Sequence, residues 1–135
     1  MPDKRKVLVF GTFDGLHLGH LNFLRQARKQ GDYLIAVIAR DNNVKKIKGH
    51  WPKQNEKLRR QNMQKIKMVN QVILGEKNYK NRSKIIQKIK PQTICLGYDQ
   101  PVLRLKNKQI KIIRLRPYKK EKYKSSILRN LAKEG

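Results

Sequence analysis

The chain has little cysteine, little acid and no long apolar run. Its 135 residues include 1 cysteine, 9 aspartates and glutamates and 3 histidines. The single thiol, Cys95, excludes an internal disulfide and a cysteine-based zinc site, and its apolar neighbours predict a small core residue. The first apolar run, residues 7–10, is far too short for a signal peptide or a membrane span. We therefore expect a cytoplasmic protein that does not enter a membrane.

The scarcity of acid leaves a large positive charge. Lysine and arginine number 34, which gives a formal net charge of +25. Such a charge attracts polyanions and nucleotides. The lysines are scattered along the chain without a single basic block, which is typical of a solvated surface in a lysine-rich protein. The charge is explained either by a solvated surface without a function of its own or by a role in binding nucleic acid. Non-specific nucleic-acid binding is expected under both interpretations.

Apolar runs alternate with helical patterns, and the length suffices for one domain with a core. Short β-branched runs predict strands at residues 6–10, 33–39, 71–74, 93–96 and 110–115. Helical spacing predicts helices at residues 18–30, 55–67, 82–90 and 125–133. Strand–helix–strand alternation favours right-handed crossovers and a parallel sheet. We predict a single Rossmann-like α/β domain over residues 1–135, with a five-stranded parallel sheet and helices on both faces.

Parallel strands point the same way, so the loops that follow them share one edge of the sheet, where ligands bind in such folds. These loops are residues 11–20, 40–53, 75–80, 97–101 and 116–124. They contain His17, His20, Asp14, Asp99, a lysine cluster and most of the aromatic residues. The residues that suit chemistry therefore gather at the predicted binding edge.

The most informative segment is residues 11–20, Gly-Thr-Phe-Asp-Gly-Leu-His-Leu-Gly-His, directly after the first predicted strand. A glycine permits the sharp turn out of the strand. His17 and His20 then stand three residues apart where a helix should begin, so both can face the same way. A helix N-terminus attracts anions through its free N–H groups and its dipole. The segment predicts a cradle for nucleotide phosphates, and the simpler alternative is two surface histidines at a helix cap.

Two motifs in this segment resemble a known superfamily. His17-Leu18-Gly19-His20 resembles the HxGH signature of the nucleotidylyltransferases, and residues 11–14 resemble the GTFD run of the cytidylyltransferase-like members. The resemblance implies that His17 and His20 contact a triphosphate and act in catalysis. The further nucleotide-binding positions that it implies are Gly11, Thr12, Phe13, Asp14 and Gly19. Asp14 would either orient a signature histidine or hold a water of a metal ion.

The lysine cluster resembles a second family segment. Residues 39–49 are similar to the ARDxxVKKIKG run of archaeal-type FAD synthetases, and Ile47-Lys48-Gly49 also resembles choline-phosphate cytidylyltransferases. The resemblance implies that Lys48 binds phosphate and stabilises the charge that develops in the reaction. Lys45 and Lys46 are further phosphate-binding candidates, assigned to the acceptor side. From residue types alone, a solvated loop is the alternative.

Two shorter matches add Arg59 and Asp99. Arg59 belongs to a Glu-x-x-Arg-Arg pattern whose arginine faces the nucleotide or the second substrate in family members; otherwise it is an exposed helix arginine. Asp99 lies in Gly97-Tyr98-Asp99-Gln100, which resembles the G-x-D-Q run of archaeal-type FAD synthetases, and would bind the acceptor. The alternative for Asp99 is an Asx turn.

The last segment with a resemblance lies near the C-terminus. The spacing of Tyr-Lys-Lys before Ser125 and Ser126 resembles the YKKxxxxSS form of archaeal-type FAD synthetases. The resemblance implies that both serines bind the nucleotide at the start of the last predicted helix, where β- and γ-phosphates can be held. Simple N-capping by Ser125 is the alternative. Arg129 stands one residue earlier than the common family spacing, and its role stays open.

The resemblance implies nucleotidyl transfer from a nucleoside triphosphate that arrives with Mg²⁺. The preferred prediction is an FMN adenylyltransferase, in which ATP and FMN give FAD and pyrophosphate. A cytidylyltransferase that uses CTP and glycerol 3-phosphate, or a similar small phosphorylated alcohol, is the alternative. A basic nucleic-acid-binding protein is the alternative from another class. Tyr79, Tyr98 and Trp51 could stack on a flavin or simply pack, and a homodimer is possible because the resembling families are often dimers.

Overall fold

A five-stranded, all-parallel sheet forms the centre of the molecule. The computed structural model describes residues 4–101, 103, 105 and 109–117. The strands are β1 (Lys6–Gly11), β2 (Tyr33–Ile38), β3 (Gln71–Leu74), β4 (Thr93–Leu96) and β5 (Lys111–Arg114). Their order across the sheet is β3-β2-β1-β4-β5, and every neighbouring pair is parallel. The predicted α/β class and five-stranded parallel sheet are therefore confirmed.

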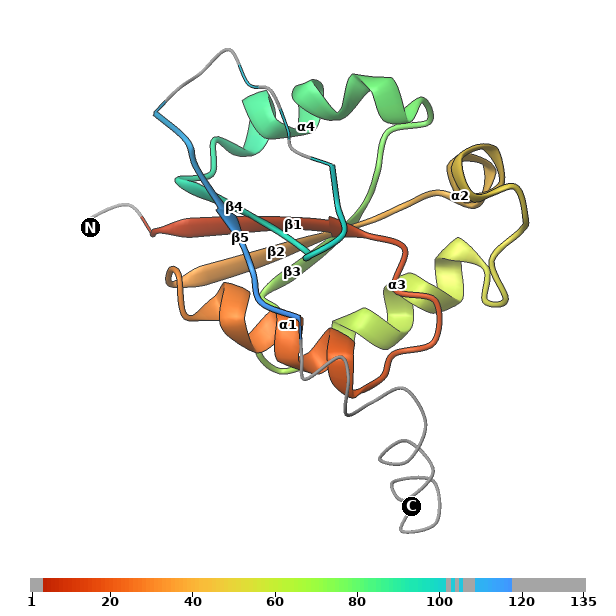
Figure 1. Cartoon of the computed structure of the whole chain (residues 1–135), viewed down its shortest axis with the longest axis horizontal. Helices are drawn as coiled ribbons and strands as arrows, with labels where there is room; N and C mark the ends of the chain where they lie inside the picture. The colour runs from red at the N-terminus through yellow and green to blue at the C-terminus, as the bar shows by residue number, and fades with distance from the viewer. Residues whose placement is uncertain (1–3, 102, 104, 106–108, 118–135) are drawn as a thin grey trace, which may run out of the picture.

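Helices cover both faces of this sheet. They are α1 (Leu18–Arg28), α2 (Asp41–Lys48), α3 (Glu56–Gln64) and α4 (Arg82–Ile89), with a short 3₁₀ turn at Tyr79–Asn81. Figure 1 shows α1 and α3 against one face and α4 against the other, with α2 beyond the ends of the strands.

The alternation of side chains along β1 explains the two layers. Successive residues of a strand point to opposite faces, and the two faces of β1 join separate apolar clusters. Val7 and Val9 pack with Leu24 of α1 and Met63 of α3, whereas Leu8 joins the cluster that contains Ile85 of α4. All of these side chains except Ile85 are completely buried.

The strand order creates a switch point beside β1. The chain runs outward from β1 to β2 and β3 on one side, and then returns to β4 and β5 on the other. Loops that follow β1 and β4 therefore leave the sheet on diverging paths, and a crevice opens where they part. Ligands bind in this place in open α/β sheets.

The structure corrects the prediction for residues 40–53, which we expected to be a loop. Residues Asp41–Lys48 form α2, with Asp41 in the first turn and lysines in the last turn. Charges so arranged favour a helix through its dipole. Gly49 then ends α2 in the left-handed conformation, with φ of 81°.

Smaller differences concern the helix ends. The helix expected over residues 55–67 is α3, which begins one residue later because Asn55 caps it by accepting a hydrogen bond from Leu58 N, and which ends earlier, at Gln64, with Lys65 as its C-cap. The helix predicted at 125–133 lies outside the described residues. In the part of the chain that the structure describes, no helix combines the length and apolar character needed to cross a bilayer.

Candidate active site

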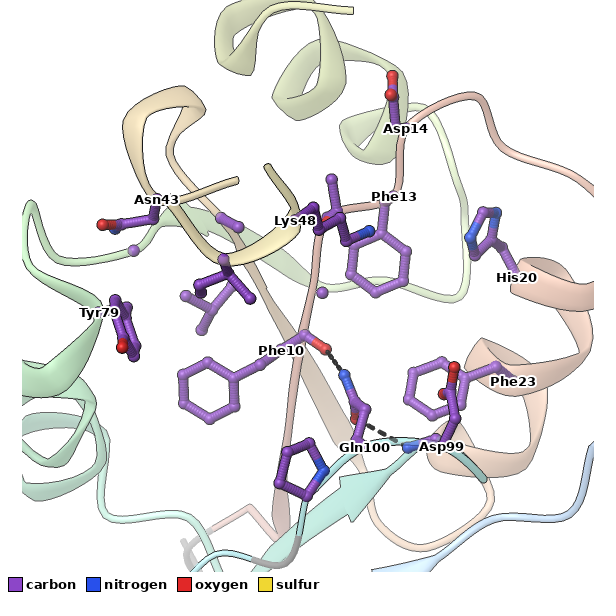
Figure 2. A pocket seen from close by; sticks show the side chains of 18 of the residues that line it. Phe10, Phe13, Asp14, His20, Phe23, Asn43, Lys48, Tyr79, Asp99 and Gln100 are labelled. Atoms are coloured by element: carbon purple, nitrogen blue, oxygen red, sulfur yellow. Dashed lines mark hydrogen bonds between the residues drawn. The ribbon is translucent and has the colours of Figure 1, made fainter. Parts of the chain in front are cut away.

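A cleft of about 1360 Å³ lies at the edge where the parallel strands end. Its walls come from the segments that follow β1 to β5, so residues distant in sequence meet there (Figure 2). The predicted site residues that line it are Gly11, Thr12, Phe13, Asp14, His17, Gly19, His20, Lys46, Lys48 and Asp99. Lys45 and Arg59 are not among its lining residues.

The two histidines form a reciprocal cap at the start of α1. His17 is the N-cap, and its Nδ1 accepts hydrogen bonds from Gly19 N at 3.0 Å and His20 N at 3.4 Å. In return His20 Nδ1 accepts from His17 N at 3.3 Å. The rings stack with their centroids 3.7 Å apart. A Cβ at Gly19 would come within 2.9 Å of the His17 ring, so glycine is needed for the ring to fold back.

This cap fixes the protonation of both rings. Burial lowers the pKa of His17; burial, followed by repulsion from His17 and Lys48, lowers the pKa of His20 to about 4. Both imidazoles are therefore neutral at pH 7. Because each Nδ1 accepts a backbone N–H, the ring proton must sit on Nε2. Each histidine thus offers one Nε2–H donor that the cap does not use.

Phe13 shapes the turn between β1 and the histidines. Phe13 is buried and adopts a positive φ of 52°, which is uncommon for a side chain of this size. Its ring packs edge-on against His20, with centroids 5.6 Å apart. A Cβ at Gly11 would lie 2.6 Å from the Phe13 ring, so a side chain at position 11 would displace it.

Asp14 ties this turn to the segment before α3. Its carboxylate accepts hydrogen bonds from Lys53 N at 2.7 Å and Gln54 N at 2.9 Å. Burial alone would raise the pKa of Asp14, but these two bonds, with the nearby charges of Arg59 and Lys53, lower it. Among the described residues its hydrogen bonds go to this backbone and not to the histidines. Of its two predicted roles, the orientation of a histidine therefore finds no support in the geometry.

The lysines of α2 divide into two groups. Lys46 and Lys48 line the cleft, and Figure 2 shows the Lys48 side chain beside Phe13 and toward His20. Neither ammonium group has a partner among the residues that the structure describes. Lys45 instead donates to Gly49 O at 3.1 Å and closes the end of α2. Arg82 and Arg116 also line the cleft; they were not predicted because isolated arginines carry no motif.

Arg59 departs from its predicted place at the nucleotide. The side chain is completely buried and lies behind the wall of the cleft. Its Nε donates to Gln54 O at 2.9 Å, Nη1 donates to Thr12 O at 2.8 Å, and Nη2 meets Asp41 Oδ1 at 2.6 Å. The predicted direct contact with the nucleotide does not fit this geometry, because all three guanidinium nitrogens bind the protein. An exposed helix arginine, the other interpretation, is also excluded.

The turn after β4 is held by a residue that the sequence did not single out. Gln100 Oε1 accepts from Gly97 N at 2.8 Å, and Gln100 Nε2 donates to Phe10 O at 2.9 Å (Figure 2). The side chain thus fastens the turn to the end of β1. Asp99 is left exposed at the cleft, and its carboxylate has no partner in the described part of the chain, so Asp99 does not make an Asx turn.

Of the three aromatic residues considered for flavin stacking, two line the cleft and one does not. Tyr79 and Tyr98 line the cleft, together with Phe10, whereas the exposed Trp51 does not. Ser125, Ser126 and Arg129 lie outside the described residues. Within the described ranges, no three or more His, Cys, Asp or Glu side chains gather as a metal-binding group.

Comparison with known proteins defines the class to which this fold and cleft belong. Residues 8–131 match the family described as cytidylyltransferase-like, and the chain belongs to this family. Among its relatives, the FAD synthase of Aciduliprofundum boonei is 39% identical over 84% of this chain and 79% of its own length. That of Thermococcus sibiricus is 36% identical over 94% and 89%.

A solved structure supports the same fold. The lipopolysaccharide core biosynthesis protein from Thermoplasma volcanium superposes with a TM-score of 0.79 at 34% sequence identity. The match covers 86% of this chain and 99% of that one. The Rossmann-like arrangement is therefore shared over nearly the whole of both proteins.

Proposed function

We propose that this protein is an FAD synthase, which transfers the adenylyl group of ATP to FMN and releases pyrophosphate. The pair of neutral histidines with free Nε2–H groups, next to the unpartnered Lys48, is the observation that carries the nucleotidyl-transfer chemistry. The choice of FMN and ATP rests on relatives named FAD synthases, which are 39% and 36% identical over most of the chain.

The proposed reaction is an in-line displacement at phosphorus. An oxygen of the FMN phosphate forms a bond to the α-phosphorus of ATP, and the bond from that phosphorus to the bridging oxygen of pyrophosphate breaks. A phosphate monoester has a second pKa of about 6, so the attacking oxygen is already ionised at pH 7 and needs no general base. Neutral histidines suit such a site, because their task is to donate hydrogen bonds and not to remove a proton.

In this proposal catalysis comes from position and charge. His17 and His20 donate Nε2–H bonds to phosphate oxygens at the start of α1, where the helix dipole also favours negative charge. Lys48 stabilises the charge that develops as pyrophosphate leaves. Hydrogen-bond donors that are already in place before the reaction stabilise the transition state most, since they need no rearrangement. Ser125 and Ser126 keep their predicted role at the departing phosphates.

The chain fits a magnesium ion that arrives with the triphosphate. Mg²⁺ usually keeps several waters and binds through phosphates and one or two carboxylates, so it needs no cage of protein ligands. The lowered pKa of Asp14 keeps its carboxylate ionised, and it would accept a hydrogen bond from one of these waters. The Mg²⁺ ion would neutralise part of the negative charge of the triphosphate.

The acceptor side is proposed to involve Asp99, with Lys45 and Lys46 of α2 as further candidates. The free carboxylate of Asp99 can accept hydrogen bonds from ribityl hydroxyls or from the N3–H group of the flavin. We expect Asp99→Ala to weaken FMN binding more than ATP binding. Titration of FMN fluorescence with a non-hydrolysable ATP analogue present measures this, and ATP-analogue binding is the control. A loss confined to the ATP analogue would move Asp99 to the nucleotide side.

The deciding experiment is a product assay. The enzyme is incubated with FMN or glycerol 3-phosphate, each with ATP or CTP, and the nucleotidyl product is identified. FAD from FMN and ATP supports the proposal. Rapid pyrophosphate release only with glycerol 3-phosphate and CTP would replace it by the cytidylyltransferase alternative, which shares the GTFD run. Homodimer formation and nucleic-acid binding stay predictions.

A further inference from the structure

The guanidinium group of Arg59 is completely buried, and its burial is compensated by three protein partners. A charged group removed from water is strongly destabilising unless its partners replace the solvent. The Arg59 side chain is 0% exposed, and each nitrogen of its guanidinium meets a protein oxygen between 2.6 and 2.9 Å away. Such complete pairing fixes the three partner groups relative to one another.

These three partners belong to three separate segments, and two of these, the turn after β1 and α2, line the cleft. Thr12 lies in the turn between β1 and the histidines, Asp41 is the first residue of α2, and Gln54 precedes α3. The guanidinium therefore joins the turn that leads to the histidines with the helix that carries Lys48. Because the fork of an arginine is planar and rigid, it holds its partners in one relative orientation.

Helix α2 connects Asp41, the partner of Arg59, to Lys48. Asp41 and Lys48 are seven residues apart in α2, which is about two turns, so they lie on nearly the same side of the helix. A tilt of α2 at Asp41 would move the Lys48 ammonium relative to His20. The repulsion by which Lys48 lowers the pKa of His20 is consistent with their closeness.

Weaker contacts around Arg59 constrain the same end of α2. Glu56 accepts from Asp41 N at 2.9 Å, and its other oxygen meets Arg40 Nη1 at 3.4 Å. The side chains of this second pair are 31% and 27% exposed, so water screens them. These contacts hold α2 to α3 alone. Of the two groups, only Arg59 also reaches the turn before the histidines.

We propose that Arg59 is a positioning residue for nucleotidyl transfer: it sets where Lys48 stands relative to the His17–His20 pair and does not touch the substrate. The inference rests on the transfer chemistry of the proposed function and not on the identity of the acceptor. It differs from the sequence prediction, which placed Arg59 at the nucleotide.

Arg59→Lys and Asp41→Asn test this inference in the full-length protein. Both keep most of the side-chain volume but break the rigid pair. We expect kcat to fall about tenfold or more in each, with the KM for ATP within about twofold, because Lys48 acts on the transition state. The exposed neighbour Arg60→Lys is the matched control and should keep the wild-type kcat. Assays run well below the melting temperature of each variant, so that all the protein measured is folded.

A double-mutant cycle separates positioning from general support of the fold. If Arg59 acts through Lys48, then Arg59→Lys should have almost no further effect on kcat in a Lys48→Ala background. Independent, multiplicative losses would overturn the inference, and so would an unchanged kcat in Arg59→Lys. Should Arg59→Lys not fold, the same cycle is made with Asp41→Asn.

The test of the role of Arg59 does not depend on which acceptor the enzyme uses, so it can fail or succeed independently of the FAD synthase proposal. If the wild type makes a cytidylyl product instead of FAD, the FMN assignment fails. The same variants are then compared on that reaction, and the cycle judges the role of Arg59 in the same way.

Discussion

His17 and His20 each have two tasks that fall on different ring nitrogens. Nδ1 accepts backbone N–H groups and begins α1, while Nε2 is left for the substrate. We expect His17→Ala and His20→Ala each to reduce turnover about a hundredfold or more, the scale for loss of a preorganised donor. Steady-state kinetics of pyrophosphate release measures this. The third histidine, His50, is exposed outside the cleft, and His50→Ala should be close to wild type.

His17→Asn separates the two tasks. Asparagine is a good N-cap, so this variant should keep the free energy of unfolding close to the wild-type value, whereas His17→Ala should lose about 1 kcal/mol. Both should lose turnover, because neither has a donor at the position of Nε2. Turnover near the wild-type rate in His17→Asn would remove the proposed role of His17.

Lys48 and Lys45 offer a second comparison within one helix. Lys48 lines the cleft without a protein partner, whereas Lys45 is turned to Gly49 O. We expect Lys48→Ala to lower kcat more than it raises the KM for ATP, because it acts on charge that develops in the transition state. Lys45→Ala should mainly raise KM, through the loss of general attraction for phosphate. The opposite pattern in initial-rate measurements would reverse these assignments.

At the scale of elements, the strands could be predicted and α2 was missed. Val7–Val9 and Leu34–Ile38 are buried apolar runs, so residue type alone determines where the strands lie. For α2 the lysines suggested a solvated loop, although Asp41 and Gly49 are start and stop signals for a helix. These two signals favour a helix, whereas the lysine-rich composition of the segment is equally typical of a solvated loop.

The burial of Arg59 could not be predicted from such local signals. It depends on oxygens of Thr12, Asp41 and Gln54, which only the folded chain brings together. The clamp formed by Gln100 has the same origin, since it reaches Phe10 across 90 positions of sequence. The motifs identified which segments meet at the cleft, whereas the roles of individual side chains depended on tertiary contacts.

Gly49 provides the prediction at this scale. Its φ is +81° and a Cβ there would meet nothing within 4 Å, so the cost of substitution is conformational alone. Gly49→Ala should lower the free energy of unfolding by about 1 kcal/mol, and Gly49→Asn by less, because asparagine tolerates this region. Urea denaturation measures both. Equal losses in the two variants would point to a cause other than backbone conformation.

For the whole molecule, we expect the free energy of unfolding to decrease as the pH is lowered. The pKa of His20 is lowered from 6.5 to about 4 in the fold, so the unfolded chain binds more protons between these values. The contribution of neutral His20 is complete above about pH 6.5 and is lost as the pH falls toward 4. Asp14, whose pKa is also lowered, adds a further loss below the ordinary aspartate range. Protonation also increases a net charge that is already +25.

Urea midpoints at pH 7.5 and pH 5 check this expectation. We expect a lower midpoint at pH 5, and a smaller difference in His20→Asn, which has no imidazole to titrate. The exposed His50→Gln serves as the control and should behave like the wild type. A midpoint that does not change between the two pH values would contradict the neutral state of the half-buried His20 ring.

The reciprocal histidine cap has a consequence for engineering this chain. Because the same two rings begin a helix and face the ligand, any substitution that removes the acceptor of the cap also removes the Nε2–H donor of the site. The turn after β4, which carries Asp99, takes no part in this cap. Selection for new acceptors should therefore accumulate changes there, and leave the histidine end invariant even when the substrate no longer resembles the original.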